Sequence, residues 1–389
     1  MNKQIETLAY LSPEGSFSYE VATGVRLSGS EYKNTTLIPC SNIALVCQAV
    51  FERKAQQGIV PIENSTEGAV NDALIAFKNI PFRIIREINH PISQSIYWQK
   101  GVPREEIEIV ASKDTALGQV RKNANKNFPN AKFEDRDSTV AAILEAAGNP
   151  KLAGVGPSMA GAINQLTDIL QQLNNQQDNA LNTTRFAVVG IQNGETNPHE
   201  GESKSTLIAQ IPNRPGGLFS ALEVLTDEGI NLSRIKSLGE VGGFETIWMD
   251  LLGHQEDRPL IKALSGLYKQ GVGIRSAGSY PIAQYLPPSI PWELNMEEIV
   301  EKLRGGVING TKYQDKTTVV FTLRDTVGSL KNAIKPFHTR GIDLIAIDSL
   351  ATGMLGEYAF YLSFATNNHL KQGEAIDELK SHSSRLVLL

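Results

Sequence analysis

The stretch Val60-Pro-Ile-Glu-Asn-Ser-Thr-Glu-Gly68 changes from apolar to polar residues within a few positions. Its apolar half predicts the end of a buried strand over Gly58–Ile62, and its polar half lies where that strand ends. Ligands bind beyond the carboxyl ends of strands in α/β folds, so Glu63 and Asn64 are candidate site residues. An alternative, compatible with the first, is that the Ser-Thr-Glu residues of the stretch cap a following helix.

Similar apolar runs recur on both sides of this stretch and predict an α/β region. The expected strands are Leu8–Leu11, Thr35–Pro39, Gly58–Ile62, Ile107–Ala111, Ala153–Gly156 and Phe186–Gly190. The expected helices are Asn42–Lys54 with Ser41 as its cap, Thr115–Asn125 with Asp114 as its cap, and Val140–Ala147. Alternating strands and helices are typical of layered α/β folds. A long extended segment, Phe82–Gln99, is expected to cross between two lobes that face each other across a cleft.

Beyond a polar linker at Asn193–Glu202, the chain repeats itself. Ser205–Gly253 aligns with Thr317–Thr366 at an offset of 112 residues, without a gap through the first half, with glycines and aliphatic residues in register. Such agreement indicates a duplication. Each copy predicts the element order βαββαβ of an α+β ferredoxin-like domain.

These patterns divide the chain into four parts. We expect a two-lobed α/β region over residues 1–192, a first repeat over 203–285, a connector over 286–316 and a second repeat over 317–389. The connector combines a stiff proline-rich stretch with a helix, Met296–Leu303, that belongs to neither copy.

The bulk composition excludes several classes of protein. The chain has 389 residues and a formal net charge of -5, which argues against a nucleic-acid or anionic-membrane partner. No signal peptide and no apolar stretch of roughly 18 residues is visible, so a cytoplasmic protein is expected. Cys40 and Cys47 are expected in the core rather than in a disulfide. The six histidines are scattered and no phosphate-binding glycine loop exists, so no metal and no nucleotide cofactor is expected.

Three further segments place polar side chains at strand ends. The turn Ser12–Ser18 offers amides and hydroxyls that would cradle an anion, although a plain turn and helix cap explains the same residues. Ser112 ends a strand, and Gln119 lies two helical turns later, where an exposed helix position is the simpler interpretation. Thr184 and Arg185 begin another strand, and an arginine there is usually part of a surface ion pair.

Together these segments resemble the prephenate dehydratase family over residues 6–192. Ser12-Pro-Glu-Gly-Ser-Phe17 is similar to the family's Gly-Pro-x-Gly-Thr-Phe, and its Pro-Ile-Glu-Asn-Ser and Thr-Arg-Phe signatures stand unchanged at 61–65 and 184–186. The resemblance implies a two-lobed, periplasmic-binding-protein-like catalytic region. The residues implied to be catalytic are Glu63, Asn64, Ser112, Gln119 and Thr184, and those implied to bind substrate are Ser12, Gly15, Ser16, Ser65, Arg185 and Phe186. One segment departs from the family, since its Ser-His-Pro-Gln-Ala-Leu reads Ser112-Lys-Asp-Thr-Ala-Leu117 here.

The reaction implied by the resemblance is the cofactor-free conversion of prephenate to phenylpyruvate in phenylalanine biosynthesis. Loss of the ring carboxylate and the ring hydroxyl makes the ring aromatic, so the protein must hold a dianion and assist the leaving hydroxide. The resemblance assigns that assistance to Thr184, with Arg185 and the amides of Ser12–Ser18 available to a carboxylate. A prephenate decarboxylase on the same scaffold, an arogenate dehydratase and a non-catalytic sensor stay open as alternatives.

The repeated units resemble ACT domains, which are amino-acid-sensing modules found behind many dehydratases. The implied effector-binding residues are Gly216, Gly217, Leu218 and Ser237 of the first copy. Both copies lack the arginine and proline of the family's Glu-Ser-Arg-Pro motif, and Asp348 of the second copy would repel an amino acid's carboxylate. We therefore expect the first copy to bind an aromatic amino acid and the second to serve assembly. The copies are expected to pack side by side within or between chains, in a homodimer or higher homo-oligomer.

Overall fold

The computed structural model describes residues 5–28, 32, 34–65, 67–163, 165–178, 182–191, 202–283, 296–305, 316–352, 356–365 and 369–389. The chain divides into two units, one of residues 1–64 and 88–189 and the other of residues 65–87 and 190–389. The expected linker at 193–202, apart from Glu202, and the proline-rich stretch at 286–291 lie outside the described residues. Within the described part of the chain, no helix is long and apolar enough to span a bilayer.

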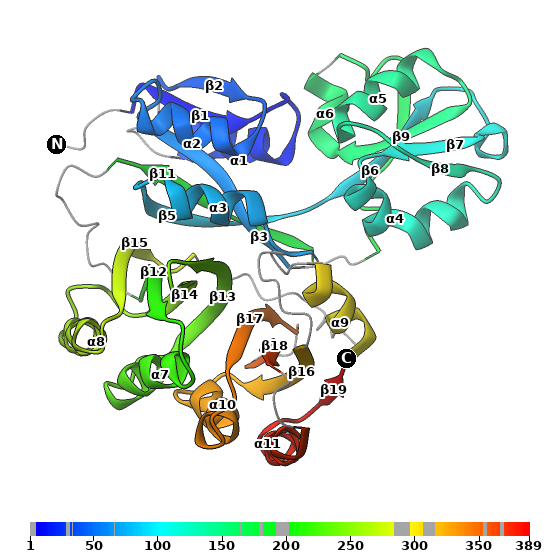
Figure 1. Ribbon diagram of the computed structural model, residues 1–389. Helices are drawn as coiled ribbons and strands as arrows, with labels where there is room; N and C mark the ends of the chain where they lie inside the picture. The colour runs from blue at the N-terminus through cyan, green and yellow to red at the C-terminus, as the bar shows by residue number, and fades with distance from the viewer. Residues whose placement is uncertain are drawn as a thin grey trace. The chain divides into compact units, whose positions relative to one another are not determined.

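The first unit contains a sheet that carries the stretch around Glu63. Its strands, in order across the sheet, are β2 (Thr36–Cys40), β1 (Thr7–Leu11), β3 (Gln57–Asn64), β11 (Thr183–Gly190) and β5 (Arg83–Pro91). Strand β1 pairs in parallel with both β2 and β3. Leu8 and Tyr10, two residues apart in β1, share a core with Phe186 and Val188 of β11 and with helix α1 (Phe17–Ser28). Strands β3 and β11 are neighbours, so their ends bring the two family-like signatures together (Figure 1).

A second sheet of the same unit follows the extended crossover. Its strands, in order, are β10 (Leu170–Leu173), β6 (Gln94–Gln99), β9 (Leu152–Pro157), β7 (Ile109–Ser112) and β8 (Lys132–Asp135). Its helices are α4 (Asp114–Asn127), α5 (Thr139–Gly148) and α6 (Ser158–Ile163). The expected extended segment Phe82–Gln99 is confirmed as β5 followed by β6, and it runs from the first sheet to the second (Figure 1).

Helix starts differ from the sequence-based expectations by one residue or more. Helix α2 (Ile43–Phe51) is capped by Asn42, whose side chain accepts a hydrogen bond from the Leu45 amide at 2.8 Å, and not by Ser41. Asp114 is the first residue of α4 rather than its cap. Helix α3 (Asn71–Asn79) begins only after Val70, so the Ser-Thr-Glu residues that follow Asn64 do not cap it. Only α2 of these three helices has a side-chain cap; Lys113 and Val70, which precede α4 and α3, make no capping hydrogen bond with their side chains.

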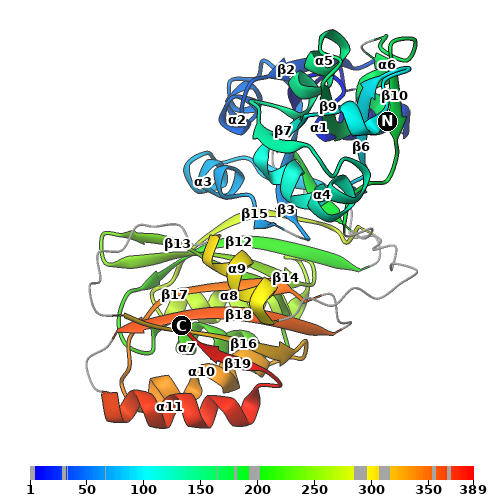
Figure 2. The same ribbon diagram turned by 90° about the vertical axis from the view of Figure 1, so that its right-hand side faces the viewer.

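The second unit contains one eight-stranded sheet built from both repeats. The first copy runs β12 (Ser203–Pro212), α7 (Gly217–Asp227), β13 (Leu232–Val241), β14 (Phe244–Leu252), α8 (Arg258–Lys269) and β15 (Gly273–Pro281). The second runs β16 (Lys316–Arg324), α10 (Ser329–Thr339), β17 (Leu344–Ala351), β18 (Glu357–Ala365), α11 (His369–His382) and β19 (Leu386–Leu388). The expected order βαββαβ is present in both copies. Their strands follow one another as β15-β12-β14-β13-β17-β18-β16-β19, so the copies pack side by side within one chain (Figure 2).

Both faces of this sheet are covered. Alternate strand residues such as Val319 and Phe321 face one large core with helices α7, α8, α10 and α11. On the opposite face, helix α9 (Met296–Gly305) inserts Ile299 and Leu303 against Val320 of the second copy. The helix that we expected in the connector, outside both copies, thus packs on the second copy.

Helix α3 covers the first copy on the same side as α9. Phe77 of α3 stacks edge to face on Trp248, with 5.2 Å between ring centroids. Lys78 donates a hydrogen bond to the Leu238 carbonyl oxygen at 2.9 Å, and Arg275 of β15 donates to the carbonyl oxygens of Phe77 and Lys78. Residues 65–87, which follow the end of strand β3, thus belong to the second unit, and the chain returns to the first unit at Ile88.

Candidate active site

The described residues place Asn64 and Thr184 in one buried cluster. Asn64 ends β3, and Thr184 is the second residue of the adjacent strand β11. The Asn64 amide nitrogen Nδ2 donates to Thr184 Oγ1 at 2.8 Å and to Asn182 Oδ1 at 2.8 Å. Since Thr184 Oγ1 accepts this bond, its own hydrogen is available to a further acceptor.

Glu63 and Arg185 form a second pair beside this cluster. The guanidinium Nη1 of Arg185 lies 3.2 Å from Glu63 Oε2, and both side chains are largely buried. Successive strand residues point to opposite faces, so this pair lies on the other face of the sheet from Asn64 and Thr184. The positive charge of Arg185 compensates the negative charge of Glu63. A dianionic ligand therefore does not meet the repulsion that a lone carboxylate would exert.

Ser112 and Gln119 belong to the second sheet and its helix α4. Ser112 ends β7, is fully buried, and donates its hydroxyl to the Val155 carbonyl oxygen of β9 at 2.7 Å. Gln119 Oε1 accepts a hydrogen bond from Gln94 Nε2 at 3.0 Å. The two expected site residues therefore have different partners: Ser112 is hydrogen-bonded to strand β9, and Gln119 is hydrogen-bonded to strand β6.

The turn Ser12–Ser18 combines a helix cap with a close approach. Ser16 Oγ accepts from the Tyr19 amide at 3.3 Å, which is the cap that the sequence left as the plain alternative. Gly15 has φ +82°, and a Cβ built on it would lie 3.0 Å from Ala160 Cα in helix α6. Only glycine fits this position without strain, and the contact joins the turn to the second sheet's layer.

Two residues of the site region were not identified from the sequence. Asn182 is 1% exposed and shares the Asn64 amide with Thr184. Gln94 is 2% exposed; it holds Gln119, and its backbone amide donates to Gln177 Oε1 at 3.0 Å. The available signal for Asn182 was its spacing of two residues from Thr184, which puts both side chains on one face of an extended chain.

The family model for prephenate dehydratase matches residues 8–194. The prephenate dehydratase of Lactococcus lactis subsp. cremoris is 33% identical over 284 residues, which cover 71% of this chain and 97% of that protein. The bifunctional chorismate mutase/prephenate dehydratase of Aquifex aeolicus is 32% identical over 285 residues, which cover 73% of this chain and 75% of that protein. This chain belongs to the prephenate dehydratase family.

A solved prephenate dehydratase gives the same result at the level of the fold. The enzyme from Arthrobacter aurescens, crystallised in complex with L-Phe, has a TM-score of 0.64 and 29% sequence identity, and the match covers 71% of this chain and 90% of that one. The chain is accordingly an enzyme, a carbon–oxygen lyase of aromatic amino acid biosynthesis that converts prephenate to phenylpyruvate.

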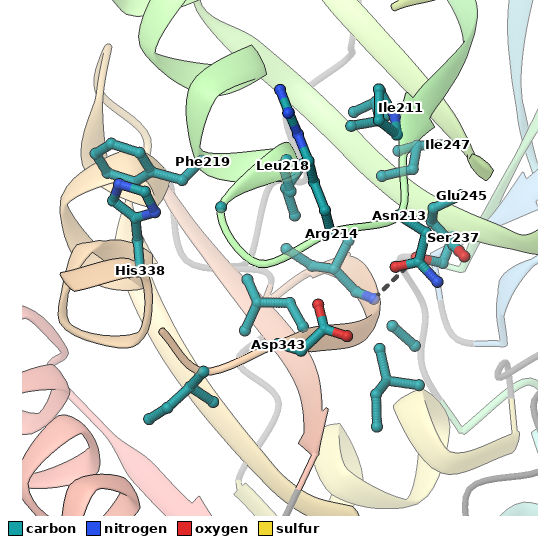
Figure 3. A pocket seen from close by; sticks show the side chains of 18 residues that line it. Ile211, Asn213, Arg214, Leu218, Phe219, Ser237, Glu245, Ile247, His338 and Asp343 are labelled. Atoms are coloured by element: carbon teal, nitrogen blue, oxygen red, sulfur yellow. Dashed lines mark hydrogen bonds between the residues drawn. The ribbon is translucent and has the colours of Figure 1, made fainter. Parts of the chain in front are cut away.

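The four expected effector residues of this prephenate dehydratase line one pocket in the second unit. Gly216, Gly217, Leu218 and Ser237 of the first copy line it together with the segment 342–347 and His338 of the second copy. Figure 3 shows Leu218 and Ser237 on one side of the pocket and His338 and Asp343 of the second copy beside them. Gly216 has φ +83°, and a Cβ on it would collide with the His338 ring, which stacks on Phe219 at 4.3 Å. The pocket is therefore made by both copies, and not by the first copy alone.

Glu245 gives this pocket an unmatched acidic group that the sequence did not indicate. Its Oε1 atom is buried with no hydrogen-bond partner among the described residues. Burial, and then the nearby Glu240 carboxylate, raise the pKa of Glu245 to about 7, against the opposing effects of the Ser237 hydroxyl and Lys78. Burial also raises the pKa of Asp343 on the facing segment. Such a site favours a ligand that brings hydrogen-bond donors or positive charge.

A second pocket contains the equivalent residues of the other copy. Gly328 and Leu330 there face Ile230–Leu232 of the first copy. Asn231 Nδ2 donates to Asp325 Oδ1 at 2.9 Å, so the two copies are hydrogen-bonded across this pocket. Asp348, which we expected to repel an effector's carboxylate, is instead ion-paired with Lys236.

Proposed function

We propose that the Asn64–Thr184 cluster assists the departure of hydroxide from prephenate. The supporting observation is the 2.8 Å hydrogen bond from Asn64 Nδ2 to Thr184 Oγ1. It orients the hydroxyl so that its hydrogen is donated to the leaving ring oxygen, and the amide polarises that donor. Asn182 acts as a positioning residue because it accepts the second hydrogen of the same amide.

The electron flow requires no cofactor. The bond from the ring to its carboxylate breaks and releases carbon dioxide, and its electron pair moves into the ring. The carbon–oxygen bond on the opposite side of the ring then breaks, and the leaving hydroxide takes up a proton and departs as water. A threonine hydroxyl is a weak acid, so Thr184 stabilises the developing negative charge mainly as a hydrogen-bond donor, and solvent completes the proton transfer.

The other residues implied by the family resemblance are suited either to binding the substrate or to holding the site's structure in place. The turn amides around Gly15 are suited to a carboxylate, since backbone amides at a helix start bind anions. Ser112 and Gln119 support the second sheet's side of a two-lobed, periplasmic-binding-protein-like cleft. Arg185 acts through its pair with Glu63, which balances charge beneath the substrate site.

One assay tests this function and its alternatives. The purified chain is incubated with prephenate and, separately, with arogenate, and product formation is followed by absorbance. We expect phenylpyruvate from prephenate. A dihydroaromatic product that keeps the hydroxyl would indicate a decarboxylase, turnover of arogenate alone would indicate an arogenate dehydratase, and no turnover of either would indicate a sensor.

We further propose that the two βαββαβ copies are ACT-type modules and that the pocket at Gly216 binds an aromatic amino acid. Glu245 and Asp343 are suited to an ammonium group, Arg214 to a carboxylate, and Leu218 with Ile247 to a ring. The Arthrobacter aurescens relative was crystallised with L-Phe, which makes phenylalanine the first effector to test.

A further inference from the structure

The eight-stranded sheet is symmetrical about the junction of β13 and β17. Each copy contributes its second strand to this junction, and the strand order reads the same outward from it in both directions. The offset of 112 residues that relates the copies also relates Lys236 to Asp348. These two residues are the Cα partners of the β13–β17 pairing, so the junction brings equivalent positions face to face.

Hydrogen bonds beside this pair follow the same symmetry. The Ile347 amide donates to Ser237 Oγ at 3.1 Å, and the Ile235 amide donates to Ser349 Oγ at 3.0 Å. Under the same offset Ile235 corresponds to Ile347, and Ser237 corresponds to Ser349. A local twofold axis therefore passes between Lys236 and its partner, flanked by identical residues.

The residue on the axis carries opposite charges in the two copies, and the buried Arg234 of the first copy, which stands opposite no charge in the second because its equivalent is Ala346, also acts on Asp348. The Lys236 ammonium is ion-paired with the Asp348 carboxylate, and the two residues are 1% and 5% exposed. At a true twofold axis between two identical surfaces, a residue on the axis meets the same residue of the other surface. Two first copies would therefore bury two ammonium groups opposite each other, and two second copies would bury two carboxylates.

We propose that the opposite charges at 236 and 348 make a first copy pair with a second copy and exclude the pairing of like copies. The eight-stranded sheet then closes within one chain. This pairing goes beyond the proposed dehydratase function.

Partner selection explains the charges better than stability does. Buried ion pairs are often no more stabilising than an apolar pair of similar size, whereas an unmatched buried charge is strongly unfavourable. Like charges directly opposite in neighbouring strands are also destabilising. An apolar pair at this junction would hold any two copies together, and the charged pair admits one combination.

A charge-exchange series in the full chain tests the pairing. We expect K236D and D348K each to lower the thermal unfolding temperature by roughly 5–10 °C, because each leaves like charges buried together. The double variant K236D/D348K should recover at least half of that loss. A double variant that is no more stable than the single ones would overturn the proposal.

Partner choice is tested separately, so that a poorly folding single variant does not decide the outcome. K236D and D348K chains, one of them labelled, are unfolded and refolded together, and the mass of the product is measured. The first copy of each chain is complementary to the second copy of the other, so we expect complexes that contain both chains. Wild-type chains treated in the same way are the control. A mixture that yields no more mixed complexes than this control would show that the charges do not select the partner.

Discussion

Thr184 is the residue on which the proposed chemistry depends most directly. We expect Thr184→Ala to lower kcat for phenylpyruvate formation by at least about a hundredfold, because a positioned donor typically contributes that much. Thr184→Ser keeps the hydroxyl and should stay within about tenfold of the wild type. Thr183→Ala, one residue earlier on the other face of β11, serves as the control. Near-normal turnover of a folded Thr184→Ala protein would remove this residue from the mechanism.

Glu245 predicts a pH dependence of stability. Its pKa is about 7 in the folded protein against the ordinary glutamate value of 4.5. Below about pH 4.5 Glu245 is protonated in both the folded and the unfolded chain. Between about pH 4.5 and pH 7 the unfolded chain has released this proton and the folded chain still holds it, so the folded state loses stability as the pH rises. The loss amounts to roughly 3 kcal/mol and persists above pH 7.

Glu245→Gln tests this dependence, because glutamine does not titrate. We expect the variant to gain stability relative to the wild type as the pH rises from 5 to 8, as measured by denaturant unfolding at each pH. Glu256→Gln, which alters an exposed carboxylate of the same copy, is the control. A constant difference between variant and wild type across this range would contradict the assignment.

Among single residues, the sequence predicted the site residues that stand in a family-like signature. It missed the site residues whose role depends on how the chain folds. Asn64 and Thr184 were found because each stands in an unbroken family-like stretch, and neighbouring strands bring them together. Asn182 stands in a polar loop where asparagine is common. Glu245 was matched only as part of the repeat, and its neighbours in the sequence do not reveal that it lines a pocket made by both copies.

Among the elements, helix α3 lies between the proposed catalytic strand and the first copy along the chain. It follows the Glu63–Asn64 strand end by a few residues, yet it packs on the first copy through Phe77 and Lys78. Lys78 bonds the Leu238 carbonyl oxygen and acts electrostatically on Glu245, which lines the proposed effector pocket. We therefore expect a ligand in that pocket to affect α3, which follows the proposed catalytic strand β3 along the chain.

Lys78→Met tests this connection. We expect it to leave kcat without effector within about twofold of the wild type and to reduce the effector's shift of apparent substrate affinity by about threefold or more, within the usual range of coupling energies. The measurement is a substrate titration with and without phenylalanine. Lys126→Met, on helix α4 of the first unit, is the matched control. An unchanged effector shift in Lys78→Met would separate α3 from regulation.

The packing of α3 and α9 could not be predicted from their sequences. The periodicity of an amphipathic helix shows that it buries one face, and not which sheet receives that face. The duplication, in contrast, was predictable, because the glycine turns and aliphatic positions of the two copies recur at a fixed offset in the sequence. The ion pair of Lys236 with Asp348 depends on strand register, which the separate stretches do not specify.

For the whole molecule, the duplication makes two related pockets unequal. The first combines the glycine turn at Gly216 with Asp343 of the second copy, and the other combines Gly328 with Asn231 of the first. An internal hydrogen bond from Asn231 to Asp325 crosses the second pocket, while the first pocket has the unmatched Glu245 oxygen. We therefore expect the pocket at Gly216 to be the effector site.

The two glycines allow this difference to be measured with a matched pair of variants. Gly216 and Gly328 cap equivalent helices with φ of 83° and 81°, so Gly216→Ala and Gly328→Ala introduce similar backbone strain. In the wild type, phenylalanine should shift apparent substrate affinity by roughly 5–150-fold if it is the effector. We expect Gly216→Ala to abolish that shift, since its Cβ would collide with the His338 ring that lines the pocket, and Gly328→Ala to retain most of it. Turnover and thermal unfolding with and without phenylalanine are recorded for both. A response lost only in Gly328→Ala would assign the effector to the second pocket, because strain is common to the two variants and the pocket is what differs.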